Sequence, residues 1–482
     1  MGGSFLFLGI AFSNAISFLI TYLIARLYGQ QVLGEYNVLY SFYMIVVSFC
    51  VFGVDKYIIK FVSSNKNNLG ILKYFVHHIV IFSIFSSILF VAISYILLNF
   101  VGLTIFGNEI IVNKARYVLF FAPFQAMSLT LYAVAQGMKN VLAQIISRNF
   151  IEPVAKISIL LIIYTLGFGQ QYNYVIFATC SIPVVLYLLC ILRNVFSISD
   201  TKRIHFFNIE FIKFSSFVFL SNIVSFGVLR LDIFVLNKYA GVGQVALYNV
   251  PFQICNLLVI VPTVFNILLS PIYSEIFLEK NFQKLKKILS QNIRSVLYII
   301  APTCCILISE RNFILSFFGP EFISSSWLVL FFVIVQILAA ISSLCNSVFL
   351  MSGNSQIVFA NTIFFMVAQA IISFLLIPYL GLYGAALSVL VPNLLLFFMR
   401  FFYLYRRYRL FVFDKYHVKI VWCSFFVYFL INLINSFFDN NALLSFFISL
   451  FLTYIVFFLF CWIYVDNTDD KDTILSNVHR IF

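Results

Sequence analysis

The sequence predicts an all-α protein that crosses a membrane many times. Hydrophobic residues make up 63% of its 482 residues and charged residues only 10%, whereas soluble domains are nearer half apolar and a quarter charged. The apolar residues form long runs, about 14 of which reach the ~20 residues that a membrane-spanning helix needs. The chain also repeats itself: GQQVLGEYNV at Gly29–Val38 returns as GVGQVALYNV at Gly241–Val250, and FGNE at Phe106–Glu109 returns as FGPE at Phe318–Glu321. Both pairs are 212 residues apart, which indicates two similar halves.

Each apolar run is expected to form one transmembrane helix, because a helix satisfies its own backbone hydrogen bonds within lipid. In chain order, the runs lie at about 4–25, 36–57, 77–100, 115–137, 141–166, 172–192, 214–237, 245–270, 293–317, 325–351, 355–378, 382–403, 418–437 and 442–465.

The duplication groups these helices into domains. A third repeat, SNAISF at Ser13–Phe18 and SNIVSF at Ser221–Phe226, matches the first run of each half. Each half has six runs, an even number, so both enter the membrane in the same direction and a pseudo-twofold along the membrane normal should relate them. We therefore expect an N-terminal six-helix lobe at 1–192, a cytoplasmic linker at 193–213, a second six-helix lobe at 214–405, two additional transmembrane helices at 406–465 and a polar cytoplasmic tail at 466–482.

Positive charge predicts the orientation of the helices. Most Lys and Arg residues, such as Lys202 and Arg203 or Arg400 and Arg406, fall in or beside alternate loops that are cytoplasmic when both termini are cytoplasmic. The formal net charge of +13 is therefore explained by topology and by contact with anionic lipids, not by nucleic-acid binding.

Neither a metal site nor a cofactor site is predicted. The nine Cys lie within predicted spans without a CxxC pair, and the five His form no HExxH motif. The segment Gly241-x-Gly243-x-x-Ala246 imitates a dinucleotide fingerprint, but no strand–helix–strand unit surrounds it.

The run at 141–166 carries the densest group of intramembrane charges. Arg148, Glu152 and Lys156 are spaced four residues apart, which places them on one face of a regular helix, and Pro153 should kink that helix. Ionisable side chains at membrane depth are costly and commonly line a polar cavity. Structural ion pairs are the alternative, but they leave one surplus positive charge that would favour an anionic partner.

Two other runs contain ionisable residues. Arg230 and Asp232 lie near the middle of one run, and their spacing of two residues points them to different faces of a helix. Asp55 and Lys56 lie near the cytoplasmic end of another, where Lys56 could extend to the membrane surface.

Arg26 and Lys238 occupy corresponding positions near the repeated segments. They could be symmetric charges at the mouth of a cavity or anchors at the membrane interface, and the sequence leaves both interpretations open.

Four segments resemble a known family: ARLYGQQVLGEYNVLYSF, LNKYAGVGQVALYNVPFQI, FFGPEFISSSWLVLFFVIVQILAAISSLCNSVFLMSGNSQ and IPYLGLYGAALSVLV. They are similar to the polysaccharide-exporter branch of the multidrug/oligosaccharidyl-lipid/polysaccharide superfamily, and most similar to its O-antigen (Wzx-type) flippases. The resemblance covers roughly residues 1–405. It implies a fold like that of the multidrug exporters of the superfamily, with two lobes around a cavity that opens alternately to each side of the membrane.

The resemblance also implies a function. The cargo would be an undecaprenyl-diphosphate-linked oligosaccharide, moved from the inner to the outer leaflet of the bacterial inner membrane, with a polysaccharide polymerase and a chain-length regulator as further partners. A diphosphate calls for cationic ligands, for which the candidates in this sequence are Arg148, Lys156, Arg230, Lys56, Arg26 and Lys238. Coupling to H⁺ or Na⁺ would use a carboxylate, for which the candidates are Glu152, Asp232 and Asp55.

Two alternatives stay open. One is a multidrug or peptidoglycan-precursor exporter of the same fold, although the surplus of intramembrane cations disfavours cationic drugs. The other is a membrane polymerase or ligase, which should carry sizeable extracytoplasmic loops with catalytic side chains. The predicted loops are short, and a transporter rather than an enzyme is therefore expected.

Overall fold

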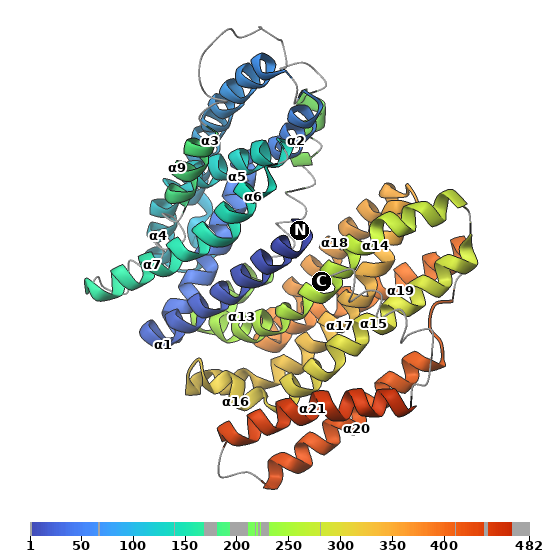
Figure 1. Ribbon diagram of the computed structural model, residues 1–482. Helices are drawn as coiled ribbons and strands as arrows, with labels where there is room; N and C mark the ends of the chain where they lie inside the picture. The colour runs from blue at the N-terminus through green and yellow to red at the C-terminus, as the bar shows by residue number, and fades with distance from the viewer. Residues whose placement is uncertain are drawn as a thin grey trace. The chain divides into compact units, whose positions relative to one another are not determined.

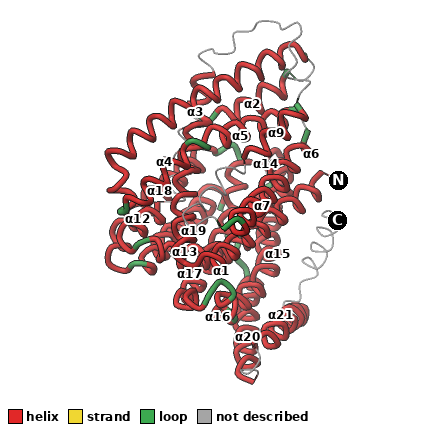
Figure 2. Tube along the Cα trace, turned by 90° about the vertical axis from the view of Figure 1, so that its left-hand side faces the viewer, coloured by secondary structure: helices red, strands yellow, loops and turns green. Residues whose placement is uncertain are grey.

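The computed structural model describes residues 2–65, 68–138, 140–167, 181–192, 211–216, 218–219, 222, 231–279, 281–409, 411–437 and 442–464. All regular secondary structure in these residues is helical, and short turns join most consecutive helices (Figure 2). The prediction of an all-α polytopic protein is confirmed. Many large apolar side chains are exposed on the helices, for example Phe100 at 81% and Trp422 at 69%, as expected where the surrounding medium is lipid.

The chain divides into two compact units, Met1–Ala246 and Leu247–Phe482. The linker predicted at 193–213 and the tail predicted at 466–482 lie almost entirely outside the described residues, so the predicted domain boundaries stay predictions.

Unit 1 consists of the blue-to-green helices of Figure 1. They are α1 (Gly2–Val51), α2 (Val54–Ser64), α3 (Leu69–Phe106), α4 (Glu109–Leu119), α5 (Ala122–Gly137), α6 (Val141–Ile145), the π-helix η1 (Ile146–Ile151), α7 (Glu152–Thr165), α9 (Ser181–Ile191), α12 (Leu231–Ala240) and the first residues of α13 (Val242–Asn256).

Unit 2 continues from α13 through the yellow-to-red helices of Figure 1. They are the 3-10 helix η3 (Leu257–Val259), α14 (Ile260–Glu279), α15 (Phe282–Ser309), α16 (Arg311–Ser316), the 3-10 helix η4 (Pro320–Ser325), α17 (Ser326–Met351), α18 (Ser355–Leu380), α19 (Leu382–Tyr408), α20 (Lys415–Phe437) and α21 (Ala442–Tyr464).

Among the described residues, eight helices are long and apolar enough to span a bilayer, or nine if the bent pair α4–α5 counts as one span. The difference from about 14 predicted runs has identifiable reasons. Two runs share α1, whose backbone breaks at Gly29 with φ 84° and ψ 177°. The run at 141–166 is divided into α6, η1 and α7, and the runs at 172–192 and 214–237 lie partly outside the described residues. The run at 442–465 contributes only a shorter apolar helix, Ser445–Leu459.

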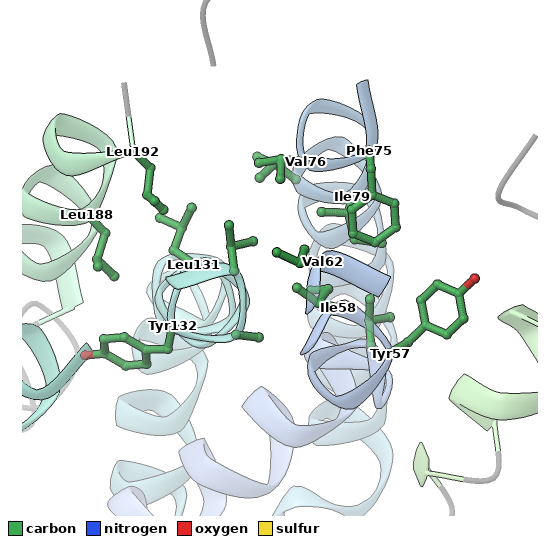
Figure 3. Packing of buried hydrophobic residues seen from close by; sticks show 14 of the residues in the cluster. Tyr57, Ile58, Val62, Phe75, Val76, Ile79, Leu131, Tyr132, Leu188 and Leu192 are labelled. Atoms are coloured by element: carbon green, nitrogen blue, oxygen red, sulfur yellow. The ribbon is translucent and has the colours of Figure 1, made fainter. Parts of the chain in front are cut away.

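The core of unit 1 forms where α5 packs between α9 and the pair α2–α3 (Figure 3). Leu131 lies at its centre, with Ile58, Val62 and Ile79 on one side and Leu188 on the other. Tyr132 lies at the edge of this core, and its hydroxyl points away from the other labelled side chains (Figure 3).

The two copies of the repeated segment meet within unit 1. Gln30 donates a hydrogen bond from Nε2 to the carbonyl oxygen of Gly243 at 2.9 Å. A Cβ built on Gly34 would lie 1.8 Å from the carbonyl oxygen of Val242, so the backbones approach as closely as glycine permits. Asn237 of α12 also donates to the carbonyl oxygen of Phe106 at 2.9 Å, which fixes α12 against α3.

In unit 2, polar side chains connect the two C-terminal helices to α15. Arg294 of α15 forms an ion pair with Asp414, which also accepts from Ser290 at 3.0 Å and contacts Nδ1 of His417 at 2.8 Å. Arg294 lies near the middle of α15. At the C-terminal end of α15, the buried carboxylate of Glu310 accepts hydrogen bonds from Asn435 at 2.6 Å and from Ser449 at 3.0 Å. An ion pair therefore connects the start of α20 to the middle of α15, and buried hydrogen bonds connect α20 and α21 to its C-terminal end.

Candidate functional site

Unit 1 contains a cavity of about 300 Å³ between α1, α2, α5 and the segment α6–η1. Its apolar walls come from residues such as Met44, Val47 and Leu129. Its polar lining is formed by Ser48, Asp55, Lys56, Tyr132, Gln136, Gln144, Arg148 and Asn222. We call this the larger cavity. It brings together three charged residues that the sequence places in two separate predicted spans.

A break between α1 and α2 positions Asp55 and Lys56. Phe52 and Gly53 both adopt positive φ, 51° and 66°, and a Cβ on Gly53 would lie 2.6 Å from the carbonyl oxygen of Ser215. The break places Asp55 in the first turn of α2, where the helix dipole favours a carboxylate. Lys56 lies 3.6 Å from Asp55, and the Lys56 side chain is 60% exposed.

A π-helical turn positions Arg148. Pro153 has no N–H, and its ring would collide with the carbonyl four residues earlier in a regular α-helix. The chain widens instead: the N–H of Glu152 donates to the carbonyl of Ser147, five residues before it. The predicted kink is therefore a π turn at Ile146–Ile151, a feature that is common at functional sites.

Arg148 faces two cavities. Besides the larger cavity, it lines a smaller one of about 280 Å³ together with Ile10, Ser13, Asn14, Gln144, Ile145 and Asn149. We call this the smaller cavity. The Arg148 side chain is exposed to these spaces and has neither an ion pair nor a hydrogen bond among the described residues. An arginine held in this way can bind a planar or tetrahedral anion with several N–H groups at once.

Glu152 and Lys156 form an ion pair beside the larger cavity. Their charged atoms are 3.0 Å apart, and the two side chains are only 14% and 15% exposed. The hydroxyl of Tyr132 donates to the other oxygen of Glu152 at 3.2 Å, and the ammonium of Lys156 lies 5.8 Å from the ring centre of Tyr40. The negative charge of Glu152 is therefore neutralised by Lys156, which lies on the same helix.

The expected stripe of three charges is thus divided. A uniform α-helix would place Arg148 on the same face as Glu152 and Lys156, but the extra residue of the π turn changes the register between them. Glu152 and Lys156 cancel each other, while Arg148, Lys56 and Asp55 leave the lining of the larger cavity with a net positive charge.

The remaining candidates lie elsewhere. Arg26 on α1 is exposed, and Lys238 on α12 is exposed with its ammonium 5.5 Å from the ring of Tyr239. Asp232 is 4% exposed at the start of α12 and accepts from the N–H of Ile233 at 3.0 Å. Arg26, Lys238 and Asp232 line neither cavity. Arg230 lies outside the described residues.

The uncharged part of the lining was not predicted. Only ionisable residues were site candidates, whereas Asn14, Gln136, Gln144 and Asn149 supply amide groups to the lining of the two cavities. One signal was available, because Ser13 and Asn14 begin the repeated SNAISF segment.

Arg400 of unit 2, which in the sequence only helps to predict the orientation of the helices, also forms hydrogen bonds within the bundle. It lies within α19 and donates to the carbonyl and hydroxyl oxygens of Ser342 at 3.1 and 2.9 Å. These bonds connect α19 to α17, so this cation has a structural partner within the bundle.

No group of three or more His, Cys, Asp or Glu side chains that could hold a metal ion occurs in the described part of the chain. The two cavities offer hydrogen-bonding side chains and the Arg148 guanidinium, and the larger cavity also contains Asp55 and Lys56. The resulting positive charge suits the binding of a polar anionic molecule.

Residues 1–277 match the family model described as polysaccharide biosynthesis protein. The chain belongs to the polysaccharide biosynthesis protein family. The match covers all of the residues that line the two cavities, and it confirms the family resemblance seen in the sequence. No curated protein sequence matches the chain.

Solved structures show the fold of this family member. A structure described as lipid II flippase MurJ in an inward closed conformation aligns with a TM-score of 0.74 and 16% identity, over 97% of this chain and 99% of that one. An inward-facing multidrug resistance MATE family transporter of the MOP superfamily aligns at 0.68 and 15%, over 82% and 94%. A MOP superfamily transporter from Pyrococcus furiosus, described as having a binding pocket of reverse polarity, aligns at 0.58 and 16%, over 84% and 95%. The chain therefore has the fold of this transporter superfamily.

Proposed function

We propose that this protein is a flippase for undecaprenyl-diphosphate-linked oligosaccharides. It moves these repeat units from the cytoplasmic to the periplasmic leaflet of the bacterial inner membrane, for the assembly of O-antigen or a related surface polysaccharide. The family match and the transporter fold support the general class.

The observation that carries the proposal is the placement of Arg148. Its guanidinium has no anionic partner among the described residues, and it lines two polar cavities inside a bundle of apolar helices. A cation at membrane depth without a carboxylate partner is costly. A diphosphate offers several oxygen acceptors to one guanidinium and relieves that cost.

The mechanism that we propose is alternating access. Arg148 binds the diphosphate within the cavities, assisted by Lys56, while the lipid tail stays in the bilayer. The cavity lining is polar enough to replace water around the head group. Arg26, Arg230, Lys238 and Lys156 are assigned secondary roles as cationic ligands along the path of the head group.

We assign ion coupling to the carboxylates Asp55, Glu152 and Asp232, with Asp55 foremost. One of its oxygens, Oδ1, is buried without a hydrogen-bond partner among the described residues, and the side chain lines the larger cavity. It can therefore take up H⁺ or Na⁺ where it would interact with cargo. Glu152 already has Lys156 as a counter-ion, which makes it the weaker candidate.

The proposed orientation has both termini in the cytoplasm, with the cargo polymerase and chain-length regulator acting on the opposite side. Fusions of a periplasm-dependent and a cytoplasm-dependent reporter to the C-terminus test it. We expect activity only from the cytoplasm-dependent reporter, because the basic loops would then be cytoplasmic. Activity from the periplasmic reporter alone would overturn the orientation.

The function is tested by the lipid profile of a cell that lacks the protein. We expect undecaprenyl-linked repeat units to accumulate on the cytoplasmic leaflet and surface polysaccharide to be lost. Arg148→Ala should restore export at least about tenfold less well than the unaltered protein, since a charge-assisted hydrogen bond is worth ~1.5–3 kcal/mol. Arg148→Lys should retain part of the activity, because it keeps the charge but not the fork of donors.

Immunoblots of membrane fractions control for insertion of each variant. Full export with Arg148→Ala would remove this residue from the site. Repeat units that reach the outer face but are not polymerised would instead indicate a polymerase.

A peptidoglycan-precursor exporter is the second candidate. The observation that favours it is the alignment with the lipid II flippase over almost the whole of both chains. Unaltered surface polysaccharide together with accumulated peptidoglycan precursor in the same lipid profile would establish it in place of the first.

A further inference from the structure

The smaller cavity differs in chemistry from the larger one. Four of its lining residues carry uncharged amide or hydroxyl groups: Ser13 and Asn14 on α1, Gln144 on α6 and Asn149 on η1. Arg148 is the only charged residue in its lining among the described residues. The larger cavity has Asp55 and Lys56 in addition to Arg148.

Asn149 is built into the smaller cavity rather than merely near it. The residue is only 8% exposed, and its amide has no hydrogen-bond partner in the described part of the chain. A Cβ built on Gly9 of α1 would lie 2.8 Å from Nδ2 of Asn149, so α1 packs closely against the Asn149 amide. The amide is therefore open to the cavity and is not satisfied by the described part of the protein, so a ligand with matching donors and acceptors can form hydrogen bonds with it.

The amide groups define the class of ligand. Each Asn or Gln side chain offers two N–H donors and one acceptor oxygen, and Ser13 adds a hydroxyl. Hydroxyl and acetamido groups of a sugar both donate and accept, so they can satisfy such a lining from several directions. A sugar carboxylate would have to compete with the diphosphate for Arg148, the counter-charge that the described lining offers.

The two cavities share Arg148 and Gln144, and Gln144 donates from Nε2 to Gln136 in the larger cavity at 3.4 Å. A ligand with a phosphate on Arg148 could therefore place the group bonded to that phosphate in the smaller cavity. In the proposed cargo, that group is the first sugar of the oligosaccharide.

We propose that the smaller cavity recognises the first sugar of the cargo and selects an uncharged one, with Asn14, Gln144 and Asn149 as specificity residues. This inference rests on the proposed function, because it takes the diphosphate to be bound by Arg148.

Binding to the purified full-length chain in detergent tests the inference with three probes. They are undecaprenyl diphosphate alone, the same lipid with one N-acetylhexosamine, and the same lipid with one hexuronic acid. We expect the N-acetylhexosamine lipid to bind at least about tenfold more tightly than the bare lipid, through two or more recovered hydrogen bonds. The hexuronic acid lipid should bind more weakly than the N-acetylhexosamine lipid.

Variants assign the preference to the cavity. Asn149→Ala and Asn14→Ala should each reduce the preference for the N-acetylhexosamine lipid about three- to tenfold and leave binding of the bare lipid unchanged. Asn14 is only half-buried, so its variant remains informative if Asn149→Ala fails to fold. Arg148→Ala should weaken all three probes. Ser158→Ala is the matched control, because Ser158 is exposed on α7 and lines neither cavity.

The outcomes distinguish the sugar site from the diphosphate site. Equal binding of the bare and the N-acetylhexosamine lipid would overturn the sugar site and leave the diphosphate site standing. Equal binding of the two sugar-bearing lipids would overturn the selection for an uncharged sugar. Absence of binding to all three probes would overturn the proposed function and this inference with it.

Discussion

At the scale of single residues, local geometry decides what each intramembrane charge can do. Lys156 is one helical turn from Glu152, so the two neutralise each other at 3.0 Å. Arg148 is the same number of residues from Glu152 on the other side, but a π turn intervenes and Arg148 faces two cavities instead. Arg148 and Lys156 are thus both four residues from Glu152 in the sequence. Only Lys156 pairs with it, whereas Arg148 faces the cavities.

A pair of variants tests the structural role of Glu152 and Lys156. Lys156→Gln alone should lower thermal stability strongly, because it leaves a mostly buried carboxylate without its counter-ion and with the Tyr132 hydroxyl as a neutral donor; breaking a buried pair costs ~3–5 kcal/mol. Glu152→Gln together with Lys156→Gln should recover most of the stability, since no net charge is then buried, and should reduce export only modestly, because Arg148 and Asp55 are assigned the principal roles. Thermal unfolding in detergent and polysaccharide export measure the two effects. A double variant that is stable but inactive would show that the pair takes part in transport.

The sequence shows which ionisable residues lie within apolar runs, but it does not show how these residues are grouped in space. Asp55, Lys56 and Arg148 were each recognisable as charged residues within apolar runs, but they come from two separate predicted spans and share a cavity only after α2 packs on α5. The Glu152–Lys156 pair follows from its spacing alone. Asn149 was not recognisable, because an amide inside an apolar helix is usually satisfied locally, and its isolation depends on how closely Gly9 brings α1.

At the scale of helices, close backbone contacts and buried pairs determine which elements meet. The repeated segments on α1 and α13 touch at Gly34 and Val242, where no larger residue than glycine fits without displacement. The polar cluster around Asp414 plays the corresponding part in unit 2, where it connects the start of α20 to α15.

Gly34→Ala should separate the two repeated segments. Its Cβ would lie 1.8 Å from the carbonyl oxygen of Val242, a backbone atom that cannot rotate away. Gly243→Ala is the matched control, because its Cβ would lie 3.1 Å from Nε2 of Gln30, the end of a flexible side chain. We expect a loss of ~1–3 kcal/mol for the first variant and a much smaller change for the second, measured by thermal unfolding in detergent. Equal effects would mean that the close approach is not a constraint.

Stability should also depend on the pH through Asp414. Burial opposes ionisation of this carboxyl, but His417, Arg294 and the Ser290 hydroxyl outweigh it and lower its pKa below the ordinary value. A carboxyl with a lowered folded-state pKa stabilises the fold above its unfolded-state pKa of about 3.9, and this contribution is lost as the pH falls through the folded-state value. We expect the midpoint temperature of thermal unfolding to decrease when the pH is lowered below about 4. The decrease per pH unit should be smaller in Asp414→Asn.

The matched control for Asp414 is Glu279. It pairs with Lys284 at 3.0 Å, but both side chains are about half exposed, and exposed pairs contribute little. Glu279→Gln should therefore leave the midpoint at neutral pH unchanged, whereas Asp414→Asn should lower it because Arg294 is buried. If the midpoint temperature changes with pH equally in the unaltered protein and in Asp414→Asn, groups other than Asp414 cause the pH dependence.

At the scale of the whole molecule, composition and repetition were sufficient to predict the class of fold. A chain with 63% hydrophobic residues and recurring apolar runs can satisfy its backbone within lipid only as helices or a closed barrel, and the length of the runs selects helices. The divisions of those helices were less predictable. The break at Gly29 falls in the polar gap between two predicted runs, whereas the break at Phe52–Gly53 and the π turn at Ile146–Ile151 lie inside predicted runs. Hydropathy alone therefore does not reveal the latter two.

The π turn has a consequence for chain length. A π-helical turn contains one residue more than the α-helical turn that it replaces, and each residue of an α-helix advances the side-chain direction by about 100°. Deleting a single residue between Ile146 and Ile151 could therefore restore a regular helix with the same hydropathy and nearly the same composition, yet rotate Arg148 away from its present direction relative to Glu152. Under the proposed function, insertions and deletions at this position would alter cargo binding without replacing any of the residues assigned to the cargo site.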